Sequence, residues 1–417
     1  MKTQLLTLKA VSPLALHRRR ASEQFAASLD YLPGSAIRGA LADLYLQGNP
    51  DRAKDELFQR LFISPSENVT FSDFLPTADK SRTRLVPLSA LTCKRFSEHE
   101  SKPGVVTDSL MRLELADELD ESGLLDLGGQ TDPLAWGNWK HCQECRKQNR
   151  EEKRDRAEAG YYTALSPFER VPVPKRMITG TAIERATGTA AHAMLFSHEV
   201  IEESSLQKNG KETLFRGLIT LPDDLYDEVD RMVKSGQRLA VGYGRSRGLG
   251  QLESGYWQEW VTAERFSLRE RWEMLNEAAK ALWERFSRQL TGQYFTLTLQ
   301  SHLALRNKVC EPILGDITAE DLGLPPEIER RRSMMTAVVV PGWNAAQNLP
   351  KPDSWALGRG SVLLFRLPAA IEPVLKRLEE IERNGLGERR AEGFGRVTVC
   401  DEFHYHFLQK ELKGISQ

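Results

Sequence analysis

The sequence lacks several features, and each absence excludes a class of protein. Its 417 residues include no apolar run near the roughly 20 residues that a membrane-spanning helix requires. The N-terminal residues lack the long apolar segment and the small-residue cleavage site of a signal peptide. Five cysteines, an odd number in a long chain, do not make a disulfide scaffold. We therefore predict a cytoplasmic protein with no membrane partner.

A strong net charge is also missing. The formal net charge is −1, because 58 acidic residues offset 57 basic ones. Such a chain has no overall attraction to nucleic acids or membranes, so any site for a polyanion must arise from local clustering of basic residues. No glycine-rich stretch ends in Gly-Lys-Ser/Thr, which excludes a P-loop.

Strand-like and helical patterns alternate along the chain, whose length predicts two or three domains. Both halves end in the same order of strand, helix, glycine–arginine loop and strand, which indicates an internal duplication. Strands and helices at these spacings are typical of a split βαβ, ferredoxin-like unit. We therefore predict an α+β fold with domains at residues 1–258 and 259–417. The first domain would carry a charged insertion at about 96–162 and a protruding β-hairpin at about 175–200.

Two similar segments, VGYGRSRGLGQLES (241–254) and NGLGERRAEGFGRVTV (384–399), mix glycine with arginine and lead into a strand-like pattern. Ala391 and Glu392 are extra residues in the second segment. Glycine lets backbone N–H groups approach a ligand, and the forked donors of arginine suit phosphate oxygens. Each segment follows a helical pattern and opens a strand, which is the reverse of a Rossmann fingerprint.

One such loop is more often a plain tight turn, but two at equivalent positions favour a shared role in binding RNA or nucleotide phosphates. The candidate contacts are Tyr243, Gly244, Arg245 and Arg247 in the first loop, and Arg389, Arg390, Phe394 and Arg396 in the second. The two aromatic residues either stack on bases or belong to the core.

Basic residues gather at two further places in the first half. LHRRR (16–20) ends the first strand, ahead of YLPGSAIRGAL (31–41), where Ser35 is the expected N-cap of a helix. These side chains contact phosphates or form a solvated basic turn. PKRMITGTAIERATGTAAH (174–192) is expected to form the hairpin, with small residues near its tip. The candidate RNA contacts are His17, Arg18, Arg19, Arg20, Ser35 and Arg38 in the first place, and Lys175, Arg176 and Arg185 in the hairpin.

A candidate metal centre lies in the charged insertion. Cys142 and Cys145 form a Cys-x-x-Cys pair, and Cys93 is the only other cysteine of the first half. Three thiolates and one imidazole complete a tetrahedral zinc site. His99 is the preferred fourth ligand, because His141 adjoins Cys142 and would strain the Cys-x-x-Cys pair if it bound the same ion. His141 remains the alternative. The zinc would be structural, holding an insertion with few apolar residues, and the alternative is three unrelated cysteines.

Two cysteines lie outside this group. We expect Cys310 and Cys400 to be ordinary buried residues.

Evidence for catalysis is weak. His17 or His192, with a nearby Lys or Tyr, would serve as the general base for metal-independent RNA cleavage at a 2′-hydroxyl. Asp30 stands just before the YLPG turn, but the surrounding pattern does not assign it a catalytic role. A lone histidine or aspartate at the end of a strand is more often structural. We therefore predict no catalysis.

Taken together, these motifs resemble those of a known protein family. YLPGSAIRGAL resembles a signature of CRISPR-associated RAMP proteins, and the two glycine–arginine segments look like the glycine-rich loops of that superfamily. GLGERRAEGFGRV, PLSALTCK and the Cys-x-x-Cys pair are most similar to the Csx-type RAMP subunit of type III-D effectors. The resemblance covers most of the chain, although the charged insertion matches poorly. It implies tandem RRM-like ferredoxin folds, a hairpin that wedges against the guide, and a place in a multisubunit complex.

The resemblance leads to three hypotheses about function. The first is a non-catalytic subunit of a type III antiviral effector that grips CRISPR RNA, at the 5′ repeat-derived tag. Its partners would be the guide RNA, other RAMP and large subunits and, indirectly, target RNA. The second is a metal-independent endoribonuclease that cuts precursor RNA, as some RAMP relatives do. The third is an assembly subunit with little RNA contact.

Overall fold

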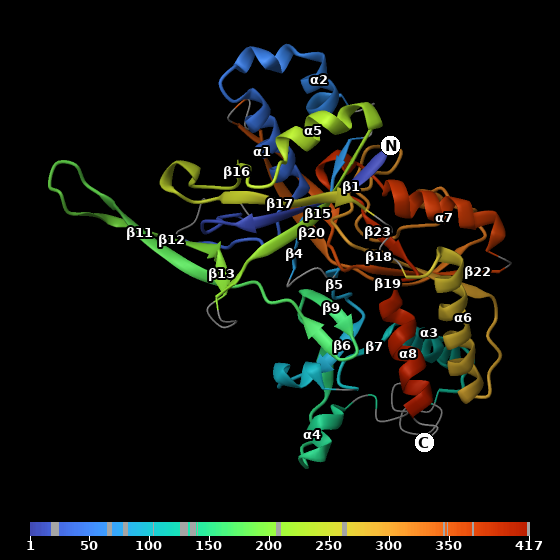
Figure 1. The fold of residues 1–417 in the computed structure, drawn as a ribbon. Coiled ribbons are helices and arrows are strands. Elements are labelled where there is room, and N and C mark those ends of the chain that lie inside the picture. Colours follow the sequence, from blue (N-terminus) through green and yellow to red (C-terminus); the bar gives the residue numbers. More distant parts are fainter. Residues whose placement is uncertain are drawn as a thin grey trace.

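The computed structural model shows a mixed α/β protein with several sheets (Figure 1). It describes residues 1–17, 25–64, 69–77, 82–102, 104–125, 132–133, 139, 141–205, 210–260, 265–344, 347, 349–368 and 371–414. Among these residues, no helix is long and apolar enough to cross a membrane. Each half of the chain contributes one main sheet. The long helix α6 (Leu268–Arg285) connects the last strand of the first sheet to the first strand of the second.

The first sheet has the strand order β16-β17-β1-β15-β3, with β4 also paired to β15. Its strands are β1 (Lys2–Ala10), β3 (Thr70–Phe71), β4 (Leu75–Thr77), β15 (Leu214–Leu221), β16 (Arg238–Ala240) and β17 (Gln251–Glu259). Residues along β15 alternate between half-buried and buried, because successive side chains of a strand point to opposite faces. Apolar residues of the sheet share one core with the helices α1 (Gly34–Leu46) and α5 (Tyr226–Met232).

Helix α1 begins one residue before the predicted N-cap. The helix starts at Gly34, and Pro33 is its N-cap, so the prediction that Ser35 caps it is wrong. The φ of proline is fixed near the helical value, which explains why the helix begins directly after Pro33. Ser35 instead lies in the first helical turn and is half-buried.

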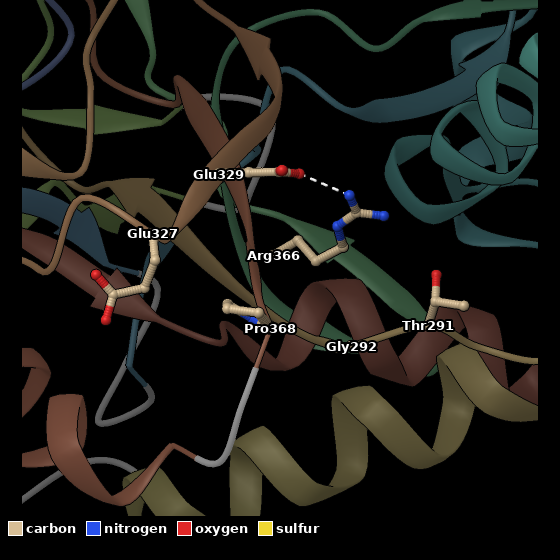
Figure 2. A pocket seen from close by; sticks show the side chains of 6 residues that line it. All are labelled: Thr291, Gly292, Glu327, Glu329, Arg366 and Pro368. Carbon is tan, nitrogen blue, oxygen red and sulfur yellow. Dashed lines mark hydrogen bonds and ion pairs between the residues drawn. The ribbon is translucent and has the colours of Figure 1, made fainter.

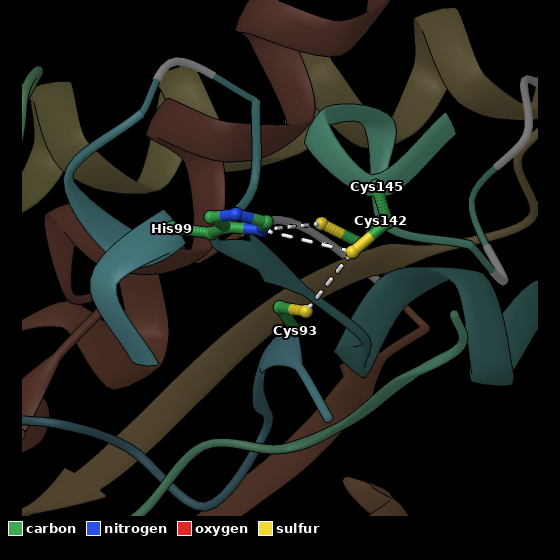
Figure 3. A group of neighbouring side chains, drawn as sticks. All are labelled: Cys93, His99, Cys142 and Cys145. Atoms are coloured by element: carbon green, nitrogen blue, oxygen red, sulfur yellow. Dashed lines mark hydrogen bonds between the residues drawn. The ribbon is translucent and has the colours of Figure 1, made fainter. Parts of the chain in front are cut away.

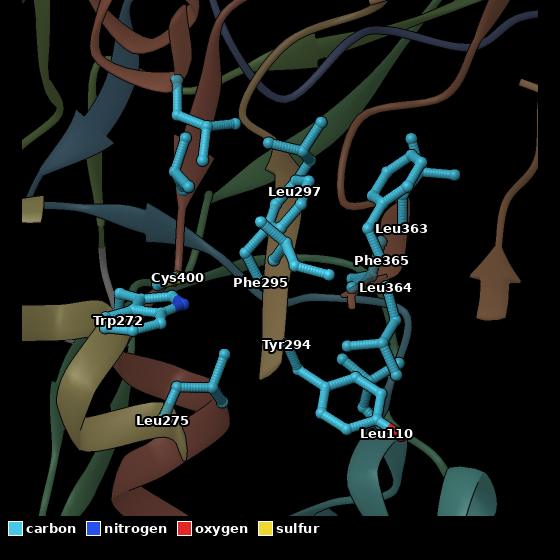
Figure 4. Packing of buried hydrophobic residues seen from close by; sticks show 14 of the residues in the cluster. Leu110, Trp272, Leu275, Tyr294, Phe295, Leu297, Leu363, Leu364, Phe365 and Cys400 are labelled. Atoms are coloured by element: carbon cyan, nitrogen blue, oxygen red, sulfur yellow. The ribbon is translucent and has the colours of Figure 1, made fainter. Parts of the chain in front are cut away.

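The second sheet has the order β19-β22-β18-β23. Its strands are β18 (Gln293–Leu299), β19 (Glu329–Met334), β22 (Val362–Leu367) and β23 (Val397–Val399). Residues 294–299 of β18 are all buried, because both of its faces are covered. The core around it includes residues of α6, of α7 (Glu372–Asn384) and of α8 (Glu402–Gly414). Figure 4 shows Trp272 and Leu275 of α6 in this core.

Helix α3 (Leu110–Glu121) belongs to the segment predicted as a charged insertion, yet it packs in the second core. Leu110, Leu115 and Leu119 are buried there. The Tyr294 hydroxyl donates to Glu118 at 2.9 Å, which ties the helix to β18. Part of the insertion therefore stabilises the C-terminal half.

The remaining elements are short. Two small sheets have the orders β7-β6-β8 and β10-β9-β5. Their strands are β5 (Arg84–Leu85), β6 (Ala90–Cys93), β7 (Thr107–Asp108), β8 (Arg154–Arg156), β9 (Tyr161–Leu165) and β10 (Phe168–Arg170). The other elements are α2 (Glu56–Phe58), α4 (Gln143–Lys147), β2 (Phe25–Ala26), β13 (Ser204–Ser205) and β14 (Lys211–Glu212).

The two main sheets repeat one arrangement. Counted along the chain, the principal strands are β1, β3, β15 and β17 in the first half and β18, β19, β22 and β23 in the second. In both sheets they lie in the order fourth, first, third, second. A two-stranded hairpin leaves each half between its second and third strands. The first, β11 (Lys175–Ile183) with β12 (Ala190–Ile201), confirms the predicted hairpin and projects from the body (Figure 1). The second, β20 (Ala337–Asn344) with β21 (Leu349–Leu357), was not recognised in the sequence.

The two halves meet through backbone contacts too close for a side chain. A Cβ atom on Gly34 of α1 would lie 2.0 Å from the Phe71 carbonyl oxygen and 2.9 Å from that of Glu392. Gly393, in the second glycine–arginine loop, has φ 97°, and its Cβ atom would lie 2.8 Å from the same Phe71 oxygen. Asp73 accepts a hydrogen bond from the Gly34 backbone N–H at 3.1 Å. The second loop therefore docks onto the first half.

This contact generates a prediction about two glycines of one helix. Gly34→Ala should destabilise the protein by about 1–3 kcal/mol, because the methyl group overlaps two carbonyl oxygens. Gly39→Ala is the matched control, since a Cβ atom there meets nothing within 4 Å and should add about 0.5–1 kcal/mol of helix stability. Urea unfolding of both variants measures the difference. Equal midpoints for the two would mean that the halves are not packed as described.

Candidate functional site

Four potential metal ligands lie together in the chain segment that connects β4 to β15 of the first sheet (Figure 3). Cys93 ends β6, His99 lies on the turn η4 (Ser97–Ser101), and Cys142 and Cys145 stand before and on α4. All four are buried, and their ligand atoms lie within 4.8 Å of one another. The Sγ atoms of Cys93 and Cys145 are 3.6 Å apart, and His99 Nδ1 is 3.7 Å from the Sγ atoms of both Cys142 and Cys145.

The spacing of these atoms fits a zinc ion. Tetrahedral zinc binds sulfur at about 2.3 Å and nitrogen at about 2.0–2.1 Å, so neighbouring ligand atoms lie roughly 3.5–3.8 Å apart. Burial, followed by the adjacent thiols, raises the pKa of Cys145 to about 12. A divalent cation would reverse this preference, because it stabilises the thiolate. The four side chains would hold the ion closed on all sides, as in a structural site.

The structure places His141 away from this cluster. His141 pairs with Lys153 across an isolated β-bridge, and its Nδ1 atom lies 3.3 Å from Arg146. The four predicted ligands, with His99 as the preferred histidine, are therefore the ones that the fold brings together. Of the two remaining cysteines, Cys400 is buried as predicted, but Cys310 is exposed, because it lies in a turn with φ 65°.

The first glycine–arginine loop lies against the segment that follows β1. The Tyr243 backbone N–H donates to the Ala15 carbonyl at 2.9 Å. Gly242 has φ 73°, and its Cβ atom would lie 2.4 Å from the same oxygen, so only glycine permits this approach. The short turn η8 (Arg245–Arg247) follows and leads to β17.

This first loop presents its side chains to solvent. Tyr243 is 43% exposed, and Arg247 is also exposed. Arg245 is exposed as well and pairs with Asp43 at 3.0 Å, an exposed ion pair of small energetic value. Gly244 has φ 74° and forms the turn itself. The loop therefore offers one aromatic ring and two accessible guanidinium groups.

The second loop is organised differently, around Glu392 on the turn η10 (Arg390–Glu392). Glu392 accepts from Arg389 at 2.6 Å and from Lys351 at 2.9 Å, and it lies 3.9 Å from Arg38 of α1. Burial opposes ionisation of this carboxyl group, but the adjacent Arg389 and Lys351 lower its pKa. Two arginines predicted to contact RNA, Arg38 and Arg389, are therefore engaged within the protein.

The aromatic residue of the second loop belongs to the core. Phe394 is only 8% exposed and packs with Ala304 and Ala356. The Arg389 guanidinium lies 4.3 Å from its ring centroid. Phe394 is therefore a core residue, which was the alternative to stacking on a base. Arg390 is exposed, and Arg396 is half-buried, with a pKa that burial lowers.

The predicted basic side chains of the first hairpin are spread along it. Lys175 donates to the Ser28 carbonyl at 3.1 Å and to Glu199 at 3.2 Å, so it fastens the hairpin to the body. Arg176 lies 3.9 Å from Glu202, and Arg185 is exposed in the turn of the hairpin. Arg18, Arg19 and Arg20 lie outside the described residues.

His17 lies in a group of aromatic rings that the sequence did not reveal. Its ring stacks on that of His198, from β12, with centroids 5.1 Å apart and planes at 17°. Tyr243 is 5.0 Å from His17 and 5.1 Å from His198. We call His17, His198 and Tyr243 the ring cluster. The ring of Phe196, also on β12, borders it, with its centroid 5.3 Å from that of His198. No sequence signal pointed to His198, because its partners come from segments remote in the chain. His192, on the same strand, is exposed.

A separate pocket lies beside the second sheet (Figure 2). It has a volume of about 370 Å³ and is lined by Thr291, Gly292, Glu327, Glu329, Arg366 and Pro368. Arg366 pairs with Glu329 at 2.6 Å, so its charge is neutralised. Two carboxylates and a paired arginine do not suit a polyanion, and the pocket shares no residue with either glycine–arginine loop.

Comparisons with known proteins give one family and several solved structures. Residues 7–253, more than half of the chain, match the family described as the RAMP superfamily. The type III-B Cmr-beta complex bound to cognate target RNA and AMPPnP contains a similar chain at 10% identity and TM-score 0.41. The match covers 98% of this chain and 93% of that one. No curated protein matches the sequence.

Two further structures show lower scores. A chain of the Csm3–Csm4 subcomplex of a type III-A CRISPR–Cas interference complex is 12% identical, with TM-score 0.33, and the match covers 89% of this chain and 96% of that one. Oligomeric Cmr4 from Pyrococcus furiosus is 12% identical, with TM-score 0.24, over 63% of this chain and 100% of that one.

The cluster of four ligands predicts about one zinc ion per chain. Cys142→Ser and Cys145→Ser should each lose the metal, and limited proteolysis should then cut within residues 96–162, because the site holds this segment. Metal analysis of purified protein measures the content. Cys310→Ser is the control, since this exposed cysteine lies outside the cluster.

The same measurement tests the fourth ligand. His99→Ala should lose zinc, whereas His141→Ala should retain it, because His141 is directed to Arg146. Full metal content in both cysteine variants would contradict the zinc site, and loss from His141→Ala alone would reverse the choice of histidine.

Proposed function

The chain belongs to the RAMP superfamily, and from this membership we propose that it is a non-catalytic CRISPR RNA-binding subunit of a type III effector complex. Within that class it is most similar to the Csx-type subunit of type III-D, on the motifs named above. We propose that it holds the backbone of the guide RNA at the 5′ repeat-derived tag. Its partners are then other RAMP and large subunits, with target RNA contacted indirectly, in the cytoplasm.

One observation carries this proposal: the first glycine–arginine loop presents an aromatic ring and accessible guanidinium groups side by side. Tyr243 is exposed, and Arg247 has no ion-pair partner among the described residues. Bases stack on aromatic rings regardless of sequence, and arginine binds phosphate oxygens. A chain with a net charge of −1 needs such a local site to bind RNA.

We also propose that the two halves are tandem ferredoxin-like domains, at residues 1–258 and 259–417. The shared strand order and the hairpins inserted at equivalent positions support this interpretation. The first hairpin would lie along the guide RNA, with Arg185 at its tip. The zinc ion would hold the insertion within the first domain.

A metal-independent endoribonuclease is the second candidate function, and the ring cluster favours it. His17 Nε2 has no hydrogen-bond partner among the described residues, and the Tyr243 ring lies beside the imidazole. A general base needs such a free nitrogen near the 2′-hydroxyl. His192 is exposed and lies outside the ring cluster, so it would serve less well.

A salt titration tests the RNA-binding loop. The double variant Arg245→Ala/Arg247→Ala should weaken binding of single-stranded repeat RNA roughly tenfold or more, since hydrogen bonds to charged groups are involved. The slope of log affinity against log salt should fall by about 0.7 for each phosphate that is no longer bound. Fluorescence anisotropy at several salt concentrations measures both.

The control is the double variant Arg231→Ala/Arg269→Ala, whose arginines are exposed and ion-paired but lie outside the loops. It should leave the slope unchanged. Arg389→Ala should destabilise the protein and leave the slope nearly unchanged, because this arginine is paired to Glu392 where the two halves meet. An unchanged slope in the first-loop variant would refute the proposed contact surface.

Cleavage is tested separately. Wild-type protein incubated with labelled repeat RNA in EDTA should leave the RNA intact over hours. Discrete products from wild type that disappear in His17→Ala, with RNA binding retained, would replace the proposed function with the endoribonuclease.

A further inference from the structure

The ring cluster is unusual because it buries polar nitrogens without partners. His17 Nε2 and both ring nitrogens of His198 have no hydrogen-bond partner among the described residues. Each such group costs free energy that two phenylalanines of similar shape would avoid. These unpaired nitrogens therefore indicate a site that is completed when a ligand binds.

The groups that face the cluster define the charge of this ligand. His17 belongs to the segment after β1, and His198 belongs to β12. Tyr243 and Arg247 belong to the first loop, and burial and then the charge of Arg247 lower the pKa of His198. Two acidic side chains of adjoining elements are engaged elsewhere: Glu199, next to His198, by Lys175 and the Ser28 N–H, and Asp43 by Arg245. Within the described part of the chain, the cluster therefore contains potential cations and no counter-ion.

Resting on the proposed RNA-binding function, we propose that the ring cluster and Arg247 form a binding site for one nucleotide of single-stranded RNA. The phosphate lies between Arg247 and the two imidazoles, and the base stacks on Tyr243. The imidazole nitrogens are covered in the free protein, and Tyr243 is the exposed member of the cluster. A nucleotide therefore reaches them by displacing the tyrosine ring, which then packs on the base.

Proton uptake accompanies binding at this site. Burial, and then the adjacent charges of the cluster, lowers the pKa of both His17 and His198, so both are neutral at pH 7 in the free protein. A bound phosphate favours the charged imidazolium and raises both pKa values. Binding therefore gains protons, and affinity rises as pH falls from 8 to 6, by up to tenfold per pH unit for each proton taken up.

The first arm of the test uses a short single-stranded RNA of mixed sequence in which each nucleotide in turn is made abasic. In wild type, one position should lower affinity roughly five- to 150-fold, which corresponds to the stacking of one base. In Tyr243→Ala this penalty should vanish, because the stacking partner is already gone. Tyr256→Ala, an exposed tyrosine on β17, is the matched control and should retain the penalty.

The second arm measures RNA affinity between pH 6 and 8. His17→Gln/His198→Gln should lose the gain in affinity at low pH that wild type shows, because glutamine cannot be protonated. His192→Gln, on the same hairpin strand and exposed, should keep it. Circular dichroism of the variants confirms that they are folded.

The outcomes separate the inference from the proposed function. If wild type binds no RNA at any pH, both fail. If it binds RNA with no abasic penalty that depends on Tyr243, or with a pH profile that the double histidine variant shares, the nucleotide site is overturned and the RNA-binding function stands.

Discussion

The close backbone contact between the halves is the constraint on which the rest of the structure depends. Gly34 and Gly393 leave no space for a side chain between α1 and the second loop. Arg359 strengthens the same junction: its guanidinium lies 3.8 Å from the Tyr31 ring centroid and donates to the Tyr161 hydroxyl. A guanidinium packed on an aromatic face and hydrogen-bonded is favourable when it is withdrawn from water. Both main sheets are oriented by these contacts.

The contact between the halves explains why two similar loops have different surroundings. The second loop contains two extra residues, and one of them, Glu392, gathers Arg389, Lys351 and Arg38 around it. The first loop has no residue at that position, so its arginines point outward. A buried carboxylate with several cationic partners stabilises an interface, whereas exposed arginines remain available to a ligand. The extra glutamate thus distinguishes a loop that is paired inside the protein from one whose arginines are exposed.

Part of this arrangement could be read from the sequence, and part could not. The cysteine spacing and the histidine near Cys93 predicted the ligand cluster, because zinc binds only a few residue types, and two of the ligands are close in the sequence. The first hairpin was predicted from its alternating pattern and turn. The second was missed, because only its first strand has a strand-like pattern; Leu349–Leu357 contains two prolines and was not read as a strand. His198 and the packing of α3 depend on contacts between remote segments, which no local pattern encodes. Whether the halves are ferredoxin-like domains, and whether these sites bind RNA, remain predictions.

The continuous chain through α6 has a consequence for assembly. Two separate subunits meet only as often as their concentrations allow, and they part again on dilution. Here the second loop docks onto the first half within one molecule, so the pairing follows a fixed effective concentration and a fixed ratio of one to one. Mass action no longer governs the contact. Each molecule therefore keeps one second half beside one first half, even at concentrations at which two separate subunits would dissociate.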